Sequence, residues 1–575
     1  MLRRFEVKKD SSSHGIQEEV SSGRKQHQAL QRIFRYKESQ KAWSSITVQH
    51  QALQRKFKLK ENKQAGSITV FLALVLALVL SLCFSLLEAG RVQGLAILAQ
   101  RSLQLSLQST FGMYHIPLWQ NYHLLFLDGN GSQGQFSLSG LEGIMMEEDG
   151  RKQRGASFYH LALKGIEITG YALATDEKGK LFRAQACKAA REQLAEAAAD
   201  SLKGQMEQGK ELAEDREELQ KKWEQAGEAE EQAKDWKAQE EEAGDKNTGS
   251  AAGQPDGGQE EGEKGTDTNG KEPGSAQSGQ ELPENPIELV KMWKSSPILA
   301  MVVENPSELS GKAISLQDTL GSRRIESGNL AAPTKEKLEK IWLLQYLDYY
   351  FSCQNGEGEG GCKTHALDYE LEYCIGGKAT DKENLERTVK ELLLLREAGN
   401  FATIMQDSQK QSLALEMAAA VAGFTGIAPL VHAVQVGILL AWSYVESILD
   451  VRCLLSGGKV PLVKKVSEWK SDISSGQKTL EQKPSGQEHE AGLDYREYLQ
   501  VLLLTVNETA LTSRAMDIIE RNIRMVPGEG QFCMDHMIGG VDAEALYGAH
   551  TLFLGFATGA KGGMYHFSSR KQLFY

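Results

Sequence analysis

The chain has 575 residues, of which 41% are hydrophobic and 25% are charged, and its formal net charge is −12. A chain of this length suggests two to four domains, and an acidic net charge is not typical of a nucleic-acid-binding protein. Seven Cys and 12 Pro also exclude a small disulfide-stapled scaffold and a Pro-rich chain.

Residues 1–64 form a basic tail with 15 Lys and Arg against 6 Asp and Glu, whereas the rest of the chain is acidic. The tail contains a near-duplication: Gln26–Arg32 recurs at Gln49–Arg55, and Ser45–Val48 recurs at Ser67–Val70. Two copies are too few for a solenoid, so we interpret the repeat as a tandem duplication of the segment before the apolar run.

Residues 65–88 are predicted to form a transmembrane helix, because 24 residues without a charge separate Lys63 from Glu88. About 20 apolar residues suffice to cross a hydrocarbon core of roughly 30 Å. The positive-inside rule places the basic tail in the cytoplasm and the acidic remainder outside. Apolar residues continue at helical spacing beyond Glu88, which predicts one long helix over 67–111 with an amphipathic second half.

Gly66 and Ser67 form a candidate processing site, because Lys63 precedes them and the apolar run begins directly after Gly66, as in prepilin-type cleavage sites. In pilins, a Glu five residues after the cut neutralises the N-terminal amine of a neighbouring subunit, and here that position is Phe71. We therefore expect that the protein is not a standard filament subunit. The sequence leaves cleavage between Gly66 and Ser67 open.

Residues 89–243 are predicted to be an extracytoplasmic region of helices and strands. Tyr122–Leu127 is expected to be a short strand, Ser157–Thr175 is a β stretch, and Asp176–Gly179 forms a turn. From Leu181 to Ala243 the chain is rich in Ala, Glu, Gln and Lys, which predicts a long solvated helix. Residues 244–285 contain too few apolar residues to bury a core, which predicts a disordered acidic linker.

Residues 286–575 return to a globular composition and are predicted to be a second extracytoplasmic α+β region. Helices are expected at 335–347, 382–398, 402–422, 428–455 and 494–524, and a strand pair at 346–352 and 367–375 around the loop 354–361. C-terminal strands are expected at 532–538, 549–555 and 565–569. The uncharged run 417–445 is interpreted as a buried helical hairpin rather than a second span, because Gly423, Gly426 and Pro429 interrupt it.

Three motifs are candidates for chemistry in the outer region. Cys353 and Cys362 flank a Gly-rich loop and could form a disulfide outside the cell. Two C-x-x-H pairs, Cys362 with His365 and Cys533 with His536, would make a zinc site only if the fold joined them, and we favour unrelated positions. The Gly-rich stretch 558–563 lacks the residue order of a phosphate-binding loop. The sequence therefore predicts no catalytic residues, no metal site and no cofactor.

Five stretches carry a resemblance to a known family: Gly66–Leu72, Leu124–Asp128, Ile168–Asp176, Leu367–Gly377, and Ala441–Leu462 with its Gly457–Leu462 end. Together they resemble an uncharacterised bacterial membrane-protein family associated with Tad-type pilus and type II secretion-like gene clusters. The resemblance covers most of the chain from residue 64 onward, apart from the insert at 200–285. Gly66–Leu72 is also similar to the anchor of TadE/TadG-like pseudopilins, although Phe71 departs from the wider pilin pattern.

The fold class that follows is α+β, with one N-terminal transmembrane helix extending into a long helix and a mixed extracytoplasmic region with a disordered insert. We expect a single-pass cell-membrane protein whose N-terminus is cytoplasmic and whose C-terminal region is extracytoplasmic. The resemblance implies a pseudopilin-like or accessory structural component of a Tad-like pilus or secretion machine, not an enzyme. The alternative is a membrane-tethered extracytoplasmic enzyme of unknown reaction. The expected partners are the lipid bilayer and other pilus or secretion membrane proteins, without nucleic acid.

Overall fold

The structure is a computed structural model that describes residues 65–130, 135–152, 158–193, 204, 208–210, 216–247, 286–333, 340–471, 492–553 and 563–575. The basic tail with its duplication, the linker residues 248–285 and the Gly-rich stretch 558–562 therefore lie outside the described residues. The described residues fall into two units. The first contains residues 65–90 and 552–553, and the second contains the remainder.

Helix α2 (Ala65–Phe111) runs through 47 residues without a break. This confirms the single long helix predicted over 67–111. Its first part belongs to the first unit, and the part from Arg91 onward belongs to the second. In the second part the side chains of Ala99, Leu103 and Leu107 recur every four residues and are buried, as expected for one face of an amphipathic helix.

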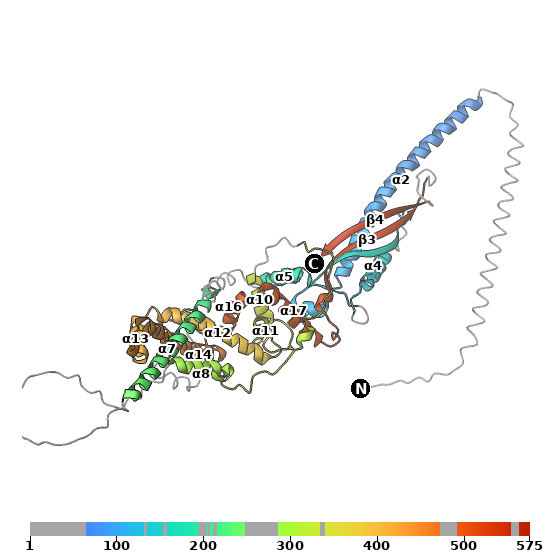
Figure 1. The fold of residues 1–575 in the computed structure, drawn as a ribbon. Helices are drawn as coiled ribbons and strands as arrows, with labels where there is room; N and C mark the ends of the chain where they lie inside the picture. The colour runs from blue at the N-terminus through green and yellow to red at the C-terminus, as the bar shows by residue number, and fades with distance from the viewer. Residues whose placement is uncertain are drawn as a thin grey trace, which may run out of the picture. The chain divides into compact units, whose positions relative to one another are not determined.

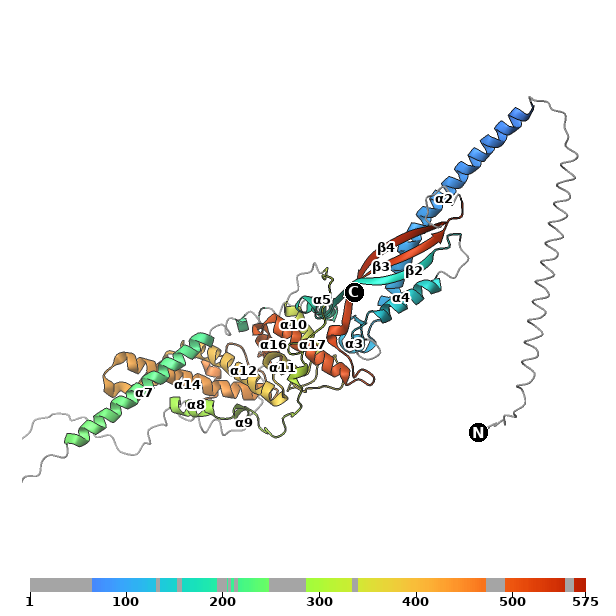
Figure 2. The ribbon, with the colours of Figure 1, turned by 45° about the vertical axis from the view of Figure 1, so that its right-hand side comes forward.

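An antiparallel sheet is built around β3 (Met537–His550). β3 pairs with β2 (Ala162–Leu173), with β4 (Met564–Phe574) and, at its start, with the two-residue strand β1 (Leu127–Asp128). Figures 1 and 2 show β3 between β2 and β4. Alternate residues of β3, from Val541 to Tyr547, form one core with the buried face of α2 and with α4 (Ser139–Lys152), because successive strand side chains point to opposite faces.

The rest of the second unit is helical. Its main helices are α3 (Ile116–Tyr122), α5 (Asp176–Gln193), α7 (Arg216–Asn247), α8 (Pro286–Ser295), α9 (Ile298–Val302), α10 (Lys340–Tyr350), α11 (Glu370–Gly376), α12 (Asp381–Ile404), α13 (Ser408–Ala422), α14 (Ala428–Leu455), α16 (Tyr495–Thr505) and α17 (Glu508–Arg524). Short 3-10 turns lie at Leu316–Asp318, Gly423–Thr425, Val466–Glu468 and Met534–His536. Figure 2 shows α7 lying across α14, and the two helices are in contact.

Helices α13 and α14 form a hairpin over the uncharged run 417–445, as predicted, but it is buried only in part, because Ala414, Ala418 and Ala422 are the buried residues of α13. Gly423–Thr425 and Gly426, whose φ is 66°, turn the chain between them. Most of α14 is buried against α12, α13, α7 and α8. Its apolar sequence is therefore explained by the core of the second unit.

The strand pair predicted at 346–352 and 367–375 is wrong. Residues 346–350 belong to α10, and residues 370–376 form α11. Both segments are short apolar runs buried on several sides, and such runs carry no periodicity that separates a strand from a helix. The short strand expected at 122–127 is reduced to β1, because residues 116–122 form α3.

Other boundaries also differ from expectation. The predicted helix 494–524 is two helices, because the Asn507 side chain accepts hydrogen bonds from the backbone amides of Thr509 and Ala510 and caps α17. Of the predicted C-terminal strands, 565–569 lies within β4, but 534–536 form a 3-10 turn and β3 occupies 537–550, where a break was expected. The long helix predicted after Leu181 is not fully solvated. Ala186 of α5 and Ala229 of α7 are among its buried residues, and α7 extends to Asn247, into the predicted linker.

A buried ion network holds the loop after α14 against α12 and α14. Arg396 of α12 donates to the Asp450 carboxylate of α14 through Nε at 3.1 Å and Nη2 at 3.0 Å. Lys464 donates to Asp450 at 2.9 Å and also to Glu446. All four residues are at most 2% exposed. Burial alone would raise the pKa of Asp450, but the charges of Arg396 and Lys464 outweigh it and lower that pKa.

Candidate membrane anchor and binding pocket

The first half of α2 presents an apolar surface. Between Ile68 and Leu87 most large apolar side chains are exposed, with Ile68 at 72% and Leu78 at 69%. No described residue buries the most apolar window of this helix. A contiguous apolar surface of this kind marks an interaction or membrane site, and the helix is long and apolar enough to cross a bilayer. Helix α14 passes the same test of length and composition, but it is mostly buried in the second unit.

The candidate processing residues lie at the start of α2. The helix begins at Ala65, so Gly66 and Ser67 are its second and third residues. A cut between them would remove only two helical residues and would leave the apolar surface intact. Phe71, which occupies the position of the pilin Glu, is 67% exposed on this surface.

Within the first unit, Glu88 marks the end of the apolar half. Its carboxylate is 2% exposed and accepts hydrogen bonds from the backbone amides of Leu552 at 3.3 Å and Phe553 at 3.4 Å. Phe84 stacks on Phe553 with ring centroids 5.2 Å apart. These contacts give the carboxylate backbone partners at the edge of the predicted span.

Within the second unit, Arg91 begins the packed part of α2. Its guanidinium is 2% exposed and donates to the carbonyl oxygens of His550 at 2.9 Å, Phe158 at 3.2 Å and Tyr159 at 3.3 Å. A buried guanidinium needs such acceptors to offset the loss of hydration. Arg91 therefore fastens the helix to the end of β3 and to the segment before β2.

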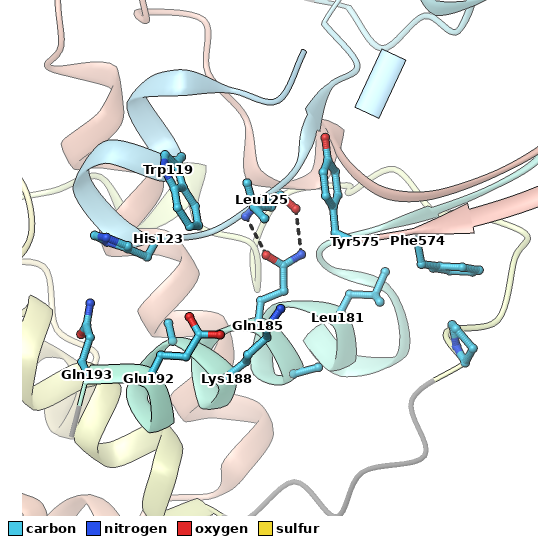
Figure 3. Close-up of a pocket in the computed structure, with 13 residues that line it drawn as sticks. Trp119, His123, Leu125, Leu181, Gln185, Lys188, Glu192, Gln193, Phe574 and Tyr575 are labelled. Atoms are coloured by element: carbon cyan, nitrogen blue, oxygen red, sulfur yellow. Dashed lines mark hydrogen bonds between the residues drawn. The ribbon is translucent and has the colours of Figure 1, made fainter. Parts of the chain in front are cut away.

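A pocket of about 390 Å³ lies in the second unit between α3, α5 and the end of β4. Figure 3 shows α5 along one side, with Trp119 and His123 opposite and Phe574 and Tyr575 at one end. Its lining is mainly apolar and aromatic, with a few polar groups, which is the composition of small-molecule sites. The lining residues are Trp119, His123, Leu125, Leu181, Ala184, Gln185, Lys188, Ala189, Glu192, Gln193, Pro333, Phe574 and Tyr575.

Several lining groups are held by hydrogen bonds inside the protein. Gln185 bonds to the backbone amide and carbonyl of Leu125 at 2.6 and 2.8 Å, as Figure 3 shows. The Gln193 amide donates to the Tyr350 hydroxyl oxygen at 2.6 Å, and this hydroxyl lies 2.9 Å from Nδ1 of His123. Because the Tyr350 oxygen already accepts from Gln193, its own proton is free to go to His123 Nδ1, which favours the tautomer with the proton on Nε2.

Cys353 and Cys362 are both buried and are not joined in the structure. Burial raises the pKa of the Cys353 thiol to about 12 and that of Cys362 to about 11. Such thiols are poor nucleophiles because little thiolate forms. The predicted disulfide between them stays a prediction.

The two C-x-x-H pairs are engaged elsewhere. Nδ1 of His365 lies 3.0 Å from the Glu370 carboxylate, and Nδ1 of His536 lies 2.6 Å from the Asn130 side-chain oxygen. Among the residues that the structure describes, no group of three or more His, Cys, Asp or Glu side chains could hold a metal ion. The favoured interpretation of unrelated positions fits this arrangement.

Glu372 of α11 is a buried carboxylate that sequence reasoning placed on a strand. It is fully buried and accepts hydrogen bonds from the Tyr495 hydroxyl at 2.8 Å and the Gln354 backbone amide at 2.9 Å, both through Oε1. Oε2 has no partner within the described structure. Burial raises the pKa of Glu372 from 4.5 to about 7, so the fold favours the protonated side chain near neutral pH.

This predicts a pH dependence of stability. Because the folded-state pKa is raised, the folded chain binds more protons than the unfolded chain between pH 4.5 and about 7. The contribution of Glu372 to the free energy of unfolding should fall by roughly 3 kcal/mol as pH rises through this window. Glu372→Gln should remove this loss, whereas Glu224→Gln at an exposed position of α7 should not, as measured by urea unfolding at pH 5 and pH 8. An unchanged pH dependence in Glu372→Gln would contradict this assignment.

The chain thus combines a candidate membrane anchor with a mixed region of helices and one small antiparallel sheet. A family model described as a family of unknown function (DUF5702) matches residues 276–549. The matched segment includes α8 to α17 and nearly all of β3, but not α2, β1 or β2. No curated protein and no solved structure matches the chain. The comparisons therefore connect the larger part of the second unit to an uncharacterised family.

The pocket residues were not singled out from the sequence. They come from four segments that are distant in the chain. Taken alone, the sequence of each segment is typical of a buried core or of a solvated helix. The one local signal is the pair Trp119 and His123, aromatic side chains one turn apart at the end of a seven-residue helix. This pair becomes part of a site only because the fold places α5 opposite it.

Proposed function

We propose that the chain is a single-pass cell-membrane protein anchored by the first half of α2, with the basic tail in the cytoplasm and the second unit outside. The exposed apolar surface of this half, from Ile68 to Leu87, is the observation that carries the proposal. The basic residues before Gly66 support the orientation, because Lys and Arg are retained on the cytoplasmic side of a first span. The same residues could also contact anionic lipid headgroups.

We further propose that the protein is a pseudopilin-like or accessory structural component of a Tad-like pilus or secretion machine. The resemblance of Gly66–Leu72 to TadE/TadG-like anchors supports this. The division of α2 supports it too: the second half is packed on the sheet, and the first half has its apolar side chains available to lipid or to other helices. Phe71 argues for an accessory position rather than the filament core, because it carries no charge to neutralise a neighbouring amine.

The membrane-tethered enzyme is the second candidate, and the pocket is the observation that favours it. Among the side chains that line the pocket, His123 is of the type that most often serves as a general acid or base. However, its ring is bonded to the Tyr350 hydroxyl, and burial raises the pKa of Tyr350 to about 12. This pair does not provide an activated nucleophile, so the pocket supports binding more than catalysis.

Site-specific photo-crosslinking tests the structural role. A photoreactive amino acid at Leu72 or Leu76, on the apolar surface of α2, should form adducts in living cells with membrane helices of a pilus or secretion machine, identified by mass spectrometry. The same photoreactive residue at Glu224, an exposed position of α7, serves as the control. Adducts at Leu72 and Leu76 with lipid alone would contradict the structural role and leave a simple membrane tether.

A further inference from the structure

The pocket between α3, α5 and the end of β4 combines an aromatic wall with hydrogen-bonding groups of both kinds. Trp119 and His123 lie one helical turn apart with ring centroids 4.9 Å from each other. His123 holds a left-handed backbone conformation, with φ 52° and ψ 36°, and its amide donates to the Trp119 carbonyl. This conformation ends α3 as its C-cap and holds the His123 ring beside Trp119.

The opposite wall carries one cation and one anion. Lys188 and Glu192 are one turn apart on α5, and both are exposed. Figure 3 shows the Glu192 carboxylate pointing toward the side where Trp119 and His123 lie. Neither side chain has an ion-pair or hydrogen-bond partner within the described part of the chain. The two charges cancel at the rim of the pocket. An anionic ligand would be repelled by Glu192, and a cationic ligand would be repelled by Lys188.

The polar groups of the pocket therefore suit a neutral ligand that both donates and accepts hydrogen bonds. Lys188 supplies donors, Glu192 supplies acceptors, and Nε2 of His123 supplies a donor in the tautomer that Tyr350 favours. The aromatic and aliphatic lining requires that the same ligand also has an apolar face. A sugar ring has this combination, because its C–H groups form one face and its hydroxyl groups form the rim.

We propose that this pocket binds a neutral sugar ring. The C–H face of the ring lies on Trp119, whose negative ring face attracts C–H groups. Sugar hydroxyls accept from Lys188 and His123 and donate to Glu192. A pocket of about 390 Å³ lies in the range of small-ligand sites. This inference does not depend on the membrane topology, because it rests on side chains of the second unit alone.

Calorimetric titration of the full chain in phospholipid nanodiscs tests the proposal, since alkyl-glycoside detergents would compete with the ligand. The probes are the tetramer of N-acetylglucosamine and the tetramer of glucose, with octanoate as an apolar anion. We expect saturable binding of at least one tetramer at one site. Trp119→Ala and Glu192→Gln should each weaken this binding at least tenfold.

Matched controls are Trp236→Ala and Glu224→Gln on α7, which remove an exposed residue of the same type and should leave binding unchanged. Glu192 is exposed, so its substitution keeps the test decisive even if Trp119→Ala unfolds the chain. The proposal is overturned if neither tetramer binds, if octanoate displaces the bound tetramer, or if Glu192→Gln binds like the unmodified chain.

Discussion

Asp450→Asn should lower the free energy of unfolding by about 3–5 kcal/mol, because it removes one partner from a buried charge cluster. Asp450 accepts from Arg396 and Lys464, which lie on separate segments and are at most 2% exposed. Without its negative charge, the Arg396 guanidinium would keep only neutral acceptors, such as the carbonyl oxygens of Pro461 and Leu462. Arg396 would then be a buried cation without a carboxylate partner, whereas Lys464 would keep Glu446.

The measurement is urea unfolding of the full chain followed by tryptophan fluorescence. Asp235→Asn on α7 is the matched control, because it makes the same chemical change at an exposed residue, and it should shift stability by less than about 0.5 kcal/mol. Equal unfolding curves for Asp450→Asn and the unmodified chain would show that the network does not hold the loop after α14.

Leu74→Arg combined with Leu78→Arg should move the protein from the membrane fraction to the soluble or aggregated fraction. Both side chains lie on the exposed apolar surface of α2, at 65% and 69% exposure. An Arg near the centre of a membrane helix costs about 2.5–3.5 kcal/mol, so two of them oppose insertion strongly. Carbonate extraction followed by immunoblotting measures the fraction of the protein that remains in the membrane.

Ile97→Arg with Leu105→Arg is the control for this substitution. These residues are also exposed and apolar on α2, at 53% and 49%, but they lie beyond Glu88 and outside the predicted span. The control protein should remain in the carbonate-resistant pellet. Retention of the Leu74→Arg, Leu78→Arg protein in the same pellet would contradict the anchor.

The parts of the fold that could be predicted are those with a strong local pattern. The unbroken apolar run and the helical spacing after it predict α2 almost to the residue, and the Gly and Pro residues at 423–429 predict the α13–α14 turn. The segments at 346–352 and 367–375 failed because burial on several sides removes both the period of a helix and that of a strand. Pairing could not be predicted either, since β3 pairs with β2 across most of the chain length.

The pocket could not be predicted from the sequence for a related reason. Its aromatic wall comes from residues 119–123, its polar wall from residues 185–193 and its end from residues 574–575. Each segment fits an ordinary structural role on its own, and only the packing of α5 against α3 and β4 brings their polar groups together. By contrast, the apolar helix depends on one continuous segment, which is why the sequence predicts it and the structure contains it.

In the proposed topology, the first half of α2 crosses the membrane and the second unit lies outside. Protease digestion of right-side-out membrane vesicles, with mapping of the protected fragment, tests it most directly. We expect that the second unit is digested and that a fragment containing the basic tail and residues up to about Glu88 survives. Protection of the second unit, with digestion of the tail, would contradict the orientation, and digestion of residues 68–87 would contradict the membrane span itself.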